Sequence, residues 1–167
     1  MESNINQHKP TIKNNNTLEF WRPNQDNGIF SNFYAASVEI KGKSWPTNEH
    51  YFQAQKFEGT EKEETIRKLE TPRETFQAGR ERDPNFPLRK DWEQVKEDVM
   101  YTCCYAKFTQ NQALKQFLLD TKDSKLIEAS PRDAYWGWGP NKDGKNRLGI
   151  ILMQIRDELL KQQQQKQ

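Results

Sequence analysis

The chain has 167 residues, with 26 basic and 24 acidic side chains and a formal net charge of +2 at pH 7. Such a length suits one domain with short tails. The balanced charge argues against a dedicated nucleic-acid binder, and the sequence contains no run of about 18 apolar residues that would predict a membrane span. Aromatic residues make up 11% of the chain, which excludes a wholly disordered protein.

The polar residues are concentrated at the two ends of the chain. Residues 1–17 are rich in Asn, and residues 162–167 are mostly Gln. We therefore predict a disordered leader over 1–17, one domain over 18–161 and a disordered tail over 162–167. The sequence begins without the apolar segment of a secretory signal, and its two cysteines are adjacent. We expect a cytoplasmic protein without a disulfide framework or a zinc site.

The first half of the domain predicts strands followed by helices. Alternating apolar and polar side chains on either side of Gly42 predict a hairpin. Good capping residues at Thr47, Asn48 and Thr71 predict the starts of helices. The expected strands are 18–21, 38–40 and one that begins at 44–45, and the expected helices are 49–58, 62–69 and 72–79.

The second half of the domain predicts longer helices. Trp92, Val95, Val99 and Cys103 recur at helical spacing, so both Cys103 and its neighbour Cys104 are expected to pack in the interior. The expected elements are helices over 91–108, 111–119 and 148–159 and a strand over 126–129. The fold class is α+β: a single mostly helical domain with a small antiparallel sheet near its N-terminal half.

The densest set of chemically useful side chains lies between Trp45 and Phe57. On a helix, Glu49, Gln53 and Lys56 share one face, because they are four and three residues apart. An acid, an amide and an amine beside aromatic rings predict a polar site in an apolar cleft. The same spacing also fits a solvated helix face that carries a Glu–Lys ion pair.

His50 lies at the start of the same predicted helix. The positive end of a helix lowers the pKa of an imidazole and favours its neutral form. His50 is therefore a candidate to orient a substrate or to act as a base. The alternative is a capping or packing role.

Two other segments combine aromatic rings with small polar groups. In residues 30–34 the polar pair Ser31-Asn32 lies between rings, which suits recognition of a flat heterocycle or simply ends a strand. Residues 133–139 combine an acid, two Trp and two Gly, and Asn146-Arg147 begin the last helix, which is a candidate phosphate site. The alternative is a tight loop with packed tryptophans. The sequence lacks a glycine-rich nucleotide-binding motif.

The domain carries a series of short motifs whose order and spacing together are specific. They are Ser31-Asn32-Phe33-Tyr34; Trp45-Pro46-Thr47 with Glu49-His50-Tyr51 and Gln53 to Phe57; Ala78-Gly79-Arg80; Asp91-Trp92; Ala106-Lys107-Phe108; Asp133 with Trp136-Gly137; and Asn146-Arg147-Leu148-Gly149. In these motifs the chain resembles the NADAR/YbiA-like family of N-glycosidases, and the resemblance covers residues 18–160.

The resemblance implies a hydrolase of N-glycosidic bonds. Members of that family act on the first two intermediates of riboflavin biosynthesis, which are reactive ribosylamino-pyrimidine phosphates, and release a ribose phosphate. Other members resemble ADP-ribosyl hydrolases, which remove ADP-ribose from guanine bases of nucleic acids or nucleotides. A third alternative is a non-catalytic module that binds ADP-ribose or a nucleotide. The implied partner is a small phosphorylated molecule or an ADP-ribosylated nucleic acid, with no metal, cofactor, membrane or obligate protein partner.

The resemblance also implies roles for individual residues. Glu49 is the expected carboxylate that stabilises an oxocarbenium-like transition state or activates water, and Asp133 is its expected partner or a sugar-binding group. Lys56 either tunes the pKa of Glu49 or forms a Schiff base with the ring-opened sugar. The expected substrate-binding residues are Ser31, Asn32, Phe33, Tyr34, His50, Gln53, Arg80, Lys107, Trp136, Gly137, Asn146 and Arg147.

Overall fold

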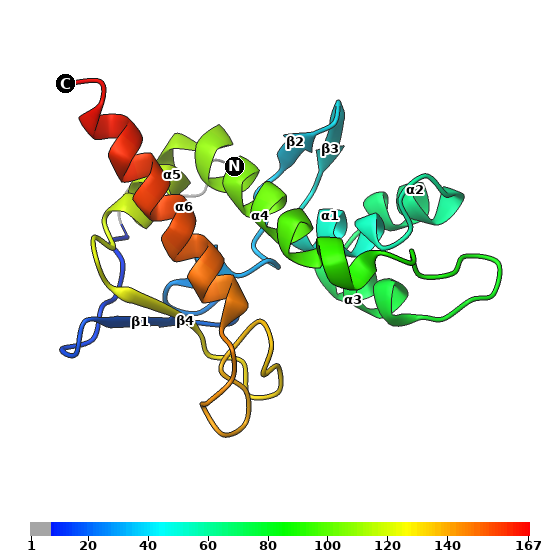
Figure 1. Cartoon of the computed structure of the whole chain (residues 1–167), viewed down its shortest axis with the longest axis horizontal. Helices are drawn as coiled ribbons and strands as arrows, with labels where there is room; N and C mark the ends of the chain where they lie inside the picture. Colours follow the sequence, from blue (N-terminus) through cyan, green and yellow to red (C-terminus); the bar gives the residue numbers. More distant parts are fainter. Residues whose placement is uncertain (1–7) are drawn as a thin grey trace. The chain divides into compact units, whose positions relative to one another are not determined.

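The computed structural model describes residues 8–167, which contain six α-helices and four strands (Figure 1). The chain divides into two compact units. The central unit is Asn32–Ala106, and the terminal unit combines the segments on either side of it. The boundary falls within helix α4 (Trp92–Gln110). The predicted α+β class is confirmed. In the part of the chain that the structure describes, no helix is long and apolar enough to cross a membrane.

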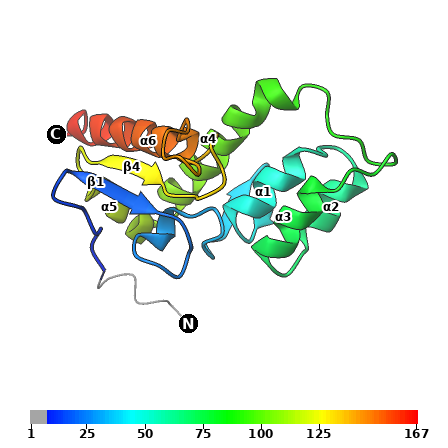
Figure 2. The same ribbon diagram turned by 90° about the horizontal axis from the view of Figure 1, so that it is seen from below.

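The terminal unit is built on a parallel pair of strands. Strand β1 (Thr17–Phe20) pairs with β4 (Lys125–Glu128), and helix α6 (Arg147–Gln164) packs against β4 (Figure 2). Helix α5 (Gln112–Leu119) packs against α6. Because residues of β1 alternate between buried and half-buried, the strand presents an apolar face to the interior.

An aromatic cluster forms the core of this unit. The ring of Phe30 lies 5.5–5.7 Å, between centroids, from the rings of Phe20, Phe108 and Phe117. Phe30 belongs to the 3-10 helix η2 (Gly28–Phe30), so the strand end considered for this segment is wrong. Asn27, which precedes η2, adopts a left-handed conformation with φ of 59°, as asparagine often does in turns.

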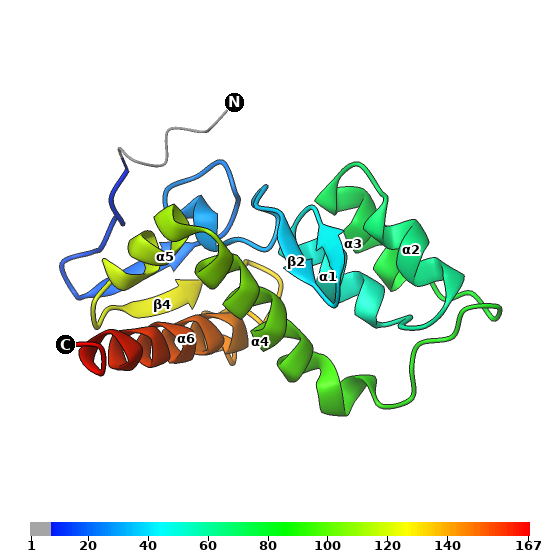
Figure 3. The ribbon, with the colours of Figure 1, turned by 90° about the horizontal axis from the view of Figure 1, so that it is seen from above.

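The central unit contains the predicted hairpin and three short helices. Strands β2 (Val38–Ile40) and β3 (Lys43–Trp45) pair antiparallel, which confirms the small antiparallel sheet. Helix α1 (Asn48–Gln55) packs against β3 and against the other two helices, α2 (Glu61–Arg67) and α3 (Pro72–Arg80) (Figure 3). The predicted caps are present: the side chain of Thr47 accepts from the backbone of α1, and Thr71 forms a capping box with Glu74.

Several element boundaries differ from the predicted ones. Helix α1 ends at Gln55 rather than at residue 58, and α6 continues to Gln164, within the segment predicted as a tail. Of the predicted leader, residues 1–7 lie outside the described residues, while Thr17 begins β1 and the backbone N–H of Thr11 donates to Asn27. The domain limits stay a prediction.

Candidate functional site

Helix α1 is buried along its whole length although most of its side chains are polar. All eight residues are buried, and five of them are Asn48, Glu49, His50, Gln53 and Gln55. Burying polar groups costs free energy unless they are hydrogen-bonded, so helices in protein interiors are usually apolar. The solvated face considered for this helix is therefore wrong. A polar helix in a protein interior is typical of a functional site.

Glu49 and Gln53 form the centre of the site. Glu49 is 5% exposed, and its Oε1 accepts a hydrogen bond of 2.7 Å from Nε2 of Gln53. This bond fixes the orientation of the carboxylate. The other polar atom of the Gln53 amide, Oε1, is buried and has no hydrogen-bond partner among residues 8–167. An unpaired buried carbonyl is costly, so Gln53 presents a ready acceptor for a hydrogen-bond donor of a ligand.

Lys56 lies one turn further along, just after α1. Its Nζ donates to the carbonyl oxygen of Gly79 at 3.4 Å and lies 5.7–5.8 Å from the ring centroids of Phe52 and Trp92. Burial lowers the pKa of Lys56 to about 8; Glu49 opposes this shift, and the nearby guanidinium groups of Arg82 and Arg80 add to it. About a tenth of the amine is therefore neutral, and nucleophilic, at pH 7.

Gly79 allows helix α3 to pack closely against the site. A Cβ atom at Gly79 would lie 1.9 Å from Oε1 of Gln53. Any larger residue would displace the Gln53 amide, and with it the partner of the Glu49 carboxylate. The glycine of the Ala78-Gly79-Arg80 motif thus has a steric explanation.

His50 has both ring nitrogens engaged within the protein. Nδ1 lies 2.8 Å from the Thr47 hydroxyl, and Nε2 lies 2.9 Å from the carbonyl oxygen of Leu69. Because a carbonyl only accepts, Nε2 carries the proton, which leaves Nδ1 to accept from the hydroxyl. The pKa of His50 is lowered, as predicted, but burial is the main cause rather than the helix end. This geometry assigns His50 a packing role, and its predicted contact with a substrate stays a prediction.

The first predicted recognition segment borders the same helix. The backbone carbonyl of Asn32 accepts from the N–H of Glu49, and the Asn32 side chain bonds to Met100 and Asn48. Phe33 and Tyr34 are half-buried. The ring of Phe33 lies 6.4 Å from that of Phe76 on α3. The central unit thus contains eight of the predicted residues, which are Asn32, Phe33, Tyr34, Glu49, His50, Gln53, Lys56 and Arg80.

The remaining predicted residues lie in the terminal unit. Oδ1 of Asp133 accepts from the backbone N–H groups of Tyr135 and Trp136, at 2.9 and 2.8 Å, and so caps its own loop. The ring of half-buried Trp136 packs edge-on against Tyr135. A Cβ atom on Gly137 would lie 2.7 Å from the carbonyl oxygen of Glu128, so the loop packs tightly on the end of β4.

Asn146 joins this loop to β4. Its Nδ2 donates to the carbonyl of Leu126 and its Oδ1 accepts from the N–H of Glu128, both at 2.9 Å, while its backbone is left-handed with φ of 50°. Arg147, which follows at the start of α6, is half-buried, and its backbone N–H donates to Tyr135. The tight loop with packed aromatics is thus present, and the phosphate role of the Asn–Arg pair stays a prediction.

Lys107 and Ser31 contact each other in the terminal unit. Nζ of Lys107 donates to the backbone carbonyl of Ser31 at 2.9 Å, and the Lys107 side chain is fully buried. Lys107 is therefore an interior cation and not a surface charge, and its predicted contact with a substrate stays a prediction.

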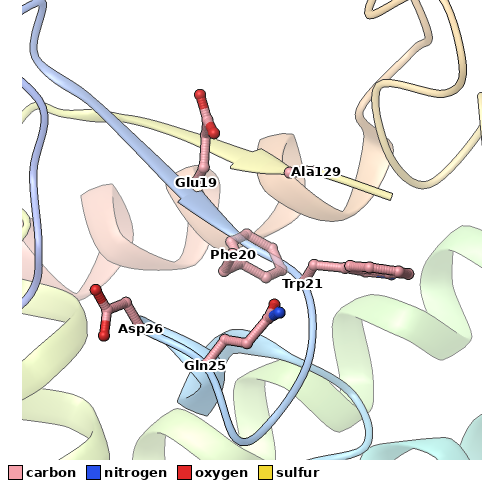
Figure 4. Close-up of a pocket in the computed structure, with 6 residues that line it drawn as sticks. All are labelled: Glu19, Phe20, Trp21, Gln25, Asp26 and Ala129. Carbon is pink, nitrogen blue, oxygen red and sulfur yellow. The ribbon is translucent and has the colours of Figure 1, made fainter. Parts of the chain in front are cut away.

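The terminal unit also contains a shallow pocket of about 510 Å³, lined by Glu19, Phe20, Trp21, Gln25, Asp26 and Ala129. Its two carboxylates point in different directions (Figure 4). The carboxylate of Glu19 is paired with Lys13, and Arg22 covers the Trp21 ring. Because its polar groups do not converge, we place the candidate site at α1 instead.

Two residues of the central unit were not singled out from the sequence. Arg82 donates to the carbonyl oxygen of Gly79 at 3.2 Å, beside Lys56, and the exposed ring of Phe76 lies 5.1 Å from the guanidinium carbon of Arg80. The sequence could have predicted the contact between Phe76 and Arg80, because residues four positions apart are neighbours on a helix surface.

Known proteins are similar to this chain in sequence and in structure over most of its length. The sequence model described as "NADAR domain" matches residues 19–160. The N-glycosidase YbiA of Shigella boydii is 48% identical over 142 residues, which cover 85% of this chain and 88% of that protein. A riboflavin biosynthesis protein of Vibrio vulnificus is 39% identical over 142 residues, which cover 85% of this chain and 38% of that protein. The NMR structure of E. coli YbiA superposes with a TM-score of 0.80 at 44% identity, covering 93% of this chain and 89% of that one.

Proposed function

The chain belongs to the NADAR family, and we propose that it is an N-glycosidase whose substrates are the ribosylamino-pyrimidine phosphates of early riboflavin biosynthesis. Its relatives are named N-glycosidases, and the Vibrio relative is named a riboflavin biosynthesis protein. The reaction adds water across the bond between the anomeric carbon and the heterocyclic amine. Its products are ribose 5-phosphate and a free aminopyrimidine.

The observation that carries the proposal is the buried acid–amide–amine set on and just after α1. Glu49 is buried and oriented by Gln53, and Lys56 is partly buried with a pKa of about 8. Cleavage of an N-glycosidic bond builds positive charge on the sugar, which a buried carboxylate stabilises. The leaving nitrogen must also gain a proton, and a neighbouring acid supplies it.

The lowered pKa of Lys56 favours a covalent route over a purely electrostatic role. In the ring-opened sugar, C1 is joined to the heterocyclic nitrogen as an imine. The neutral Lys56 amine adds to C1, the aminopyrimidine leaves with a proton relayed by Glu49, and a Schiff base between Lys56 and the sugar remains. Water then adds to C1, and release of ribose 5-phosphate restores the amine.

The unpaired Oε1 of Gln53 supports the substrate class. A buried carbonyl oxygen binds a donor, and the amino groups of a diaminopyrimidine and the hydroxyls of ribose are both donors. A substrate that lacks such a donor would leave this oxygen buried and unpaired, which opposes its binding.

The test is a two-arm turnover assay with purified protein. One arm contains the phosphorylated riboflavin intermediates, and the other contains an oligonucleotide with ADP-ribosylated guanine. We expect release of ribose 5-phosphate in the first arm, with Glu49→Gln at least about 10³-fold slower because the carboxylate charge is lost. Glu70→Gln, an exposed site with the same change of charge, is the matched control and should be unaffected.

Each possible result of the assay has a clear meaning. Turnover only in the second arm would replace the proposed substrate with guanine-linked ADP-ribose. Turnover of Glu49→Gln at the wild-type rate would remove the catalytic role of Glu49. Borohydride added during turnover should trap a sugar adduct on Lys56, and its absence in an active enzyme would contradict the covalent route.

A further inference from the structure

We propose that Arg80 and Arg82, with the ring of Phe76 supporting Arg80, form the site that binds the phosphate group of the substrate at the end of helix α3. The identity of the ligand rests on the proposed function. The site itself rests on three features of the central unit: uncompensated cations, a supporting aromatic ring and closeness to the Lys56 amine.

The first feature is a cluster of cations without carboxylate partners. Arg82 and Lys56 both donate to the carbonyl oxygen of Gly79, at 3.2 and 3.4 Å. Among residues 8–167, neither Arg80 nor Arg82 forms an ion pair with a carboxylate. These positive charges repel one another, and an anion bound beside them would relieve that repulsion.

The second feature is the support of Arg80 by Phe76. The guanidinium carbon lies 5.1 Å from the ring centroid, within the range of a cation–π contact. Phe76 is 39% exposed, and its ring centroid lies 6.4 Å from that of Phe33. A guanidinium held on a ring loses less freedom when its N–H groups bind an oxyanion.

The third feature is the closeness of both guanidinium groups to the amine of Lys56. Each of them lowers the pKa of Lys56, while Glu49 raises it. A phosphate bound at Arg80 and Arg82 would lie next to the group proposed to attack the sugar. Ribose 5-phosphate and its derivatives carry the phosphate on the same small molecule as the anomeric carbon, which fits this proximity.

Binding is tested with ribitol 5-phosphate, which has no aldehyde and cannot form a Schiff base with Lys56. Calorimetric titration of the full chain should show that Arg80→Gln and Arg82→Gln each weaken binding at least about 10-fold, because a charge-assisted hydrogen bond is lost. Phe76→Leu should weaken binding several-fold, and Phe76→Tyr should restore it. Ribitol without phosphate should bind equally poorly to all of these proteins.

Arg73→Gln is the matched control, because Arg73 is an exposed arginine on the same helix, about 10 Å from Arg80 along the axis. It should bind ribitol 5-phosphate as the wild type does. If Arg80→Gln and Arg82→Gln bind like Arg73→Gln, or if the wild type shows no phosphate-dependent binding, the site is wrong. Arginine-dependent binding by a protein that hydrolyses neither substrate would uphold this site and refute the proposed function.

Titration of Lys56 by NMR gives a second readout that a purely structural role would not change. Saturation with ribitol 5-phosphate should raise the pKa of Lys56 from about 8, because the bound anion offsets the charges of Arg80 and Arg82. In Arg80→Gln the pKa of the free protein should already be higher and the rise smaller. An unchanged Lys56 pKa on ligand binding would contradict the proposal.

Discussion

The loop of the terminal unit and helix α1 of the central unit both contain polar residues predicted to act on a substrate, but they use their hydrogen-bonding groups differently. Asp133 accepts from two backbone N–H groups of its own loop, and both ends of the Asn146 amide bond to β4. On α1, by contrast, Oε1 of Gln53 and Oδ1 of Asn48 are buried without a partner among the described residues.

This difference distinguishes residues that stabilise the fold from residues that can bind a ligand. A side chain whose donors and acceptors are all used by the backbone, as both ends of the Asn146 amide are, stabilises the structure and has little capacity left for a substrate. A buried side chain with unused capacity destabilises the free protein, and a ligand can recover that free energy. We therefore expect substitutions in the loop to change stability, and substitutions around α1 to change turnover.

Among these substitutions, Gly79→Ala should have a large effect on turnover, and it tests whether the polar groups of α1 act on a substrate. The added Cβ would meet Oε1 of Gln53 at 1.9 Å, so the amide must move and its bond to Glu49 is lost. We expect turnover to fall at least about 30-fold, together with destabilisation of about 1–3 kcal/mol from overpacking. Steady-state kinetics and urea unfolding measure the two effects.

The double variant Gly79→Ala/Gln53→Ala is the control for this steric explanation. Shortening Gln53 to alanine removes the contacts of 1.9 and 2.6 Å with its amide but leaves the contact of 2.8 Å with its Cβ atom, so stability should recover in part while turnover stays low. If the double variant were no more stable than Gly79→Ala, the contact with the Gln53 amide would not be the cause.

Substitutions of Asn146 should produce the largest stability effects in the loop, and Asn146→Gly is the more specific of them. Glycine tolerates the left-handed backbone, so this change isolates the two side-chain bonds to β4. We expect a loss of about 2 kcal/mol in the free energy of unfolding, with a further loss of about 1 kcal/mol in Asn146→Ala from backbone strain. Equal stability of wild type and Asn146→Gly would show that these bonds contribute nothing.

The pH dependence of turnover tests the proposed role of Lys56. If the neutral amine attacks the sugar, kcat/KM should rise with pH and level off above about 8. Because the pKa of Lys56 is lower in the folded protein than its ordinary value of 10.5, the unfolded chain binds more protons between these values. The free energy of unfolding should therefore rise with pH from about 8 to about 10.5, and Lys56→Gln should remove this rise.

The sequence predicted most elements because local signals and packing agree in them. Capping residues at Thr47 and Thr71, and the turn at Gly42, correctly located α1, α3 and the hairpin. The parallel pairing of β1 with β4 was not predicted, because it joins strands more than 100 residues apart and depends on tertiary packing.

Sequence spacing placed Glu49, Gln53 and Lys56 on one face but left their burial open. Burial of α1 depends on its packing against β3, α2 and α3, which no local pattern of α1 contains. The position of Arg82 could not be predicted from local spacing either. Arg82 lies near Lys56 in the folded chain, where both side chains donate to the Gly79 carbonyl. Contacts between helices therefore account for what the spacing left undetermined.

The smallest expected effect distinguishes the two roles considered for Asp133. Asparagine retains the oxygen that accepts from Tyr135 and Trp136, so Asp133→Asn should leave the free energy of unfolding within about 0.5 kcal/mol of wild type. Asp133→Ala removes the acceptor and should cost about 1–2 kcal/mol. Urea unfolding of the two variants measures this difference. If Asp133 caps the loop, Asp133→Ala must be less stable than Asp133→Asn. Equal stability of the two variants would show that the loop does not need this side chain and would favour the sugar-binding role. A loss of turnover in Asp133→Asn would then support that role.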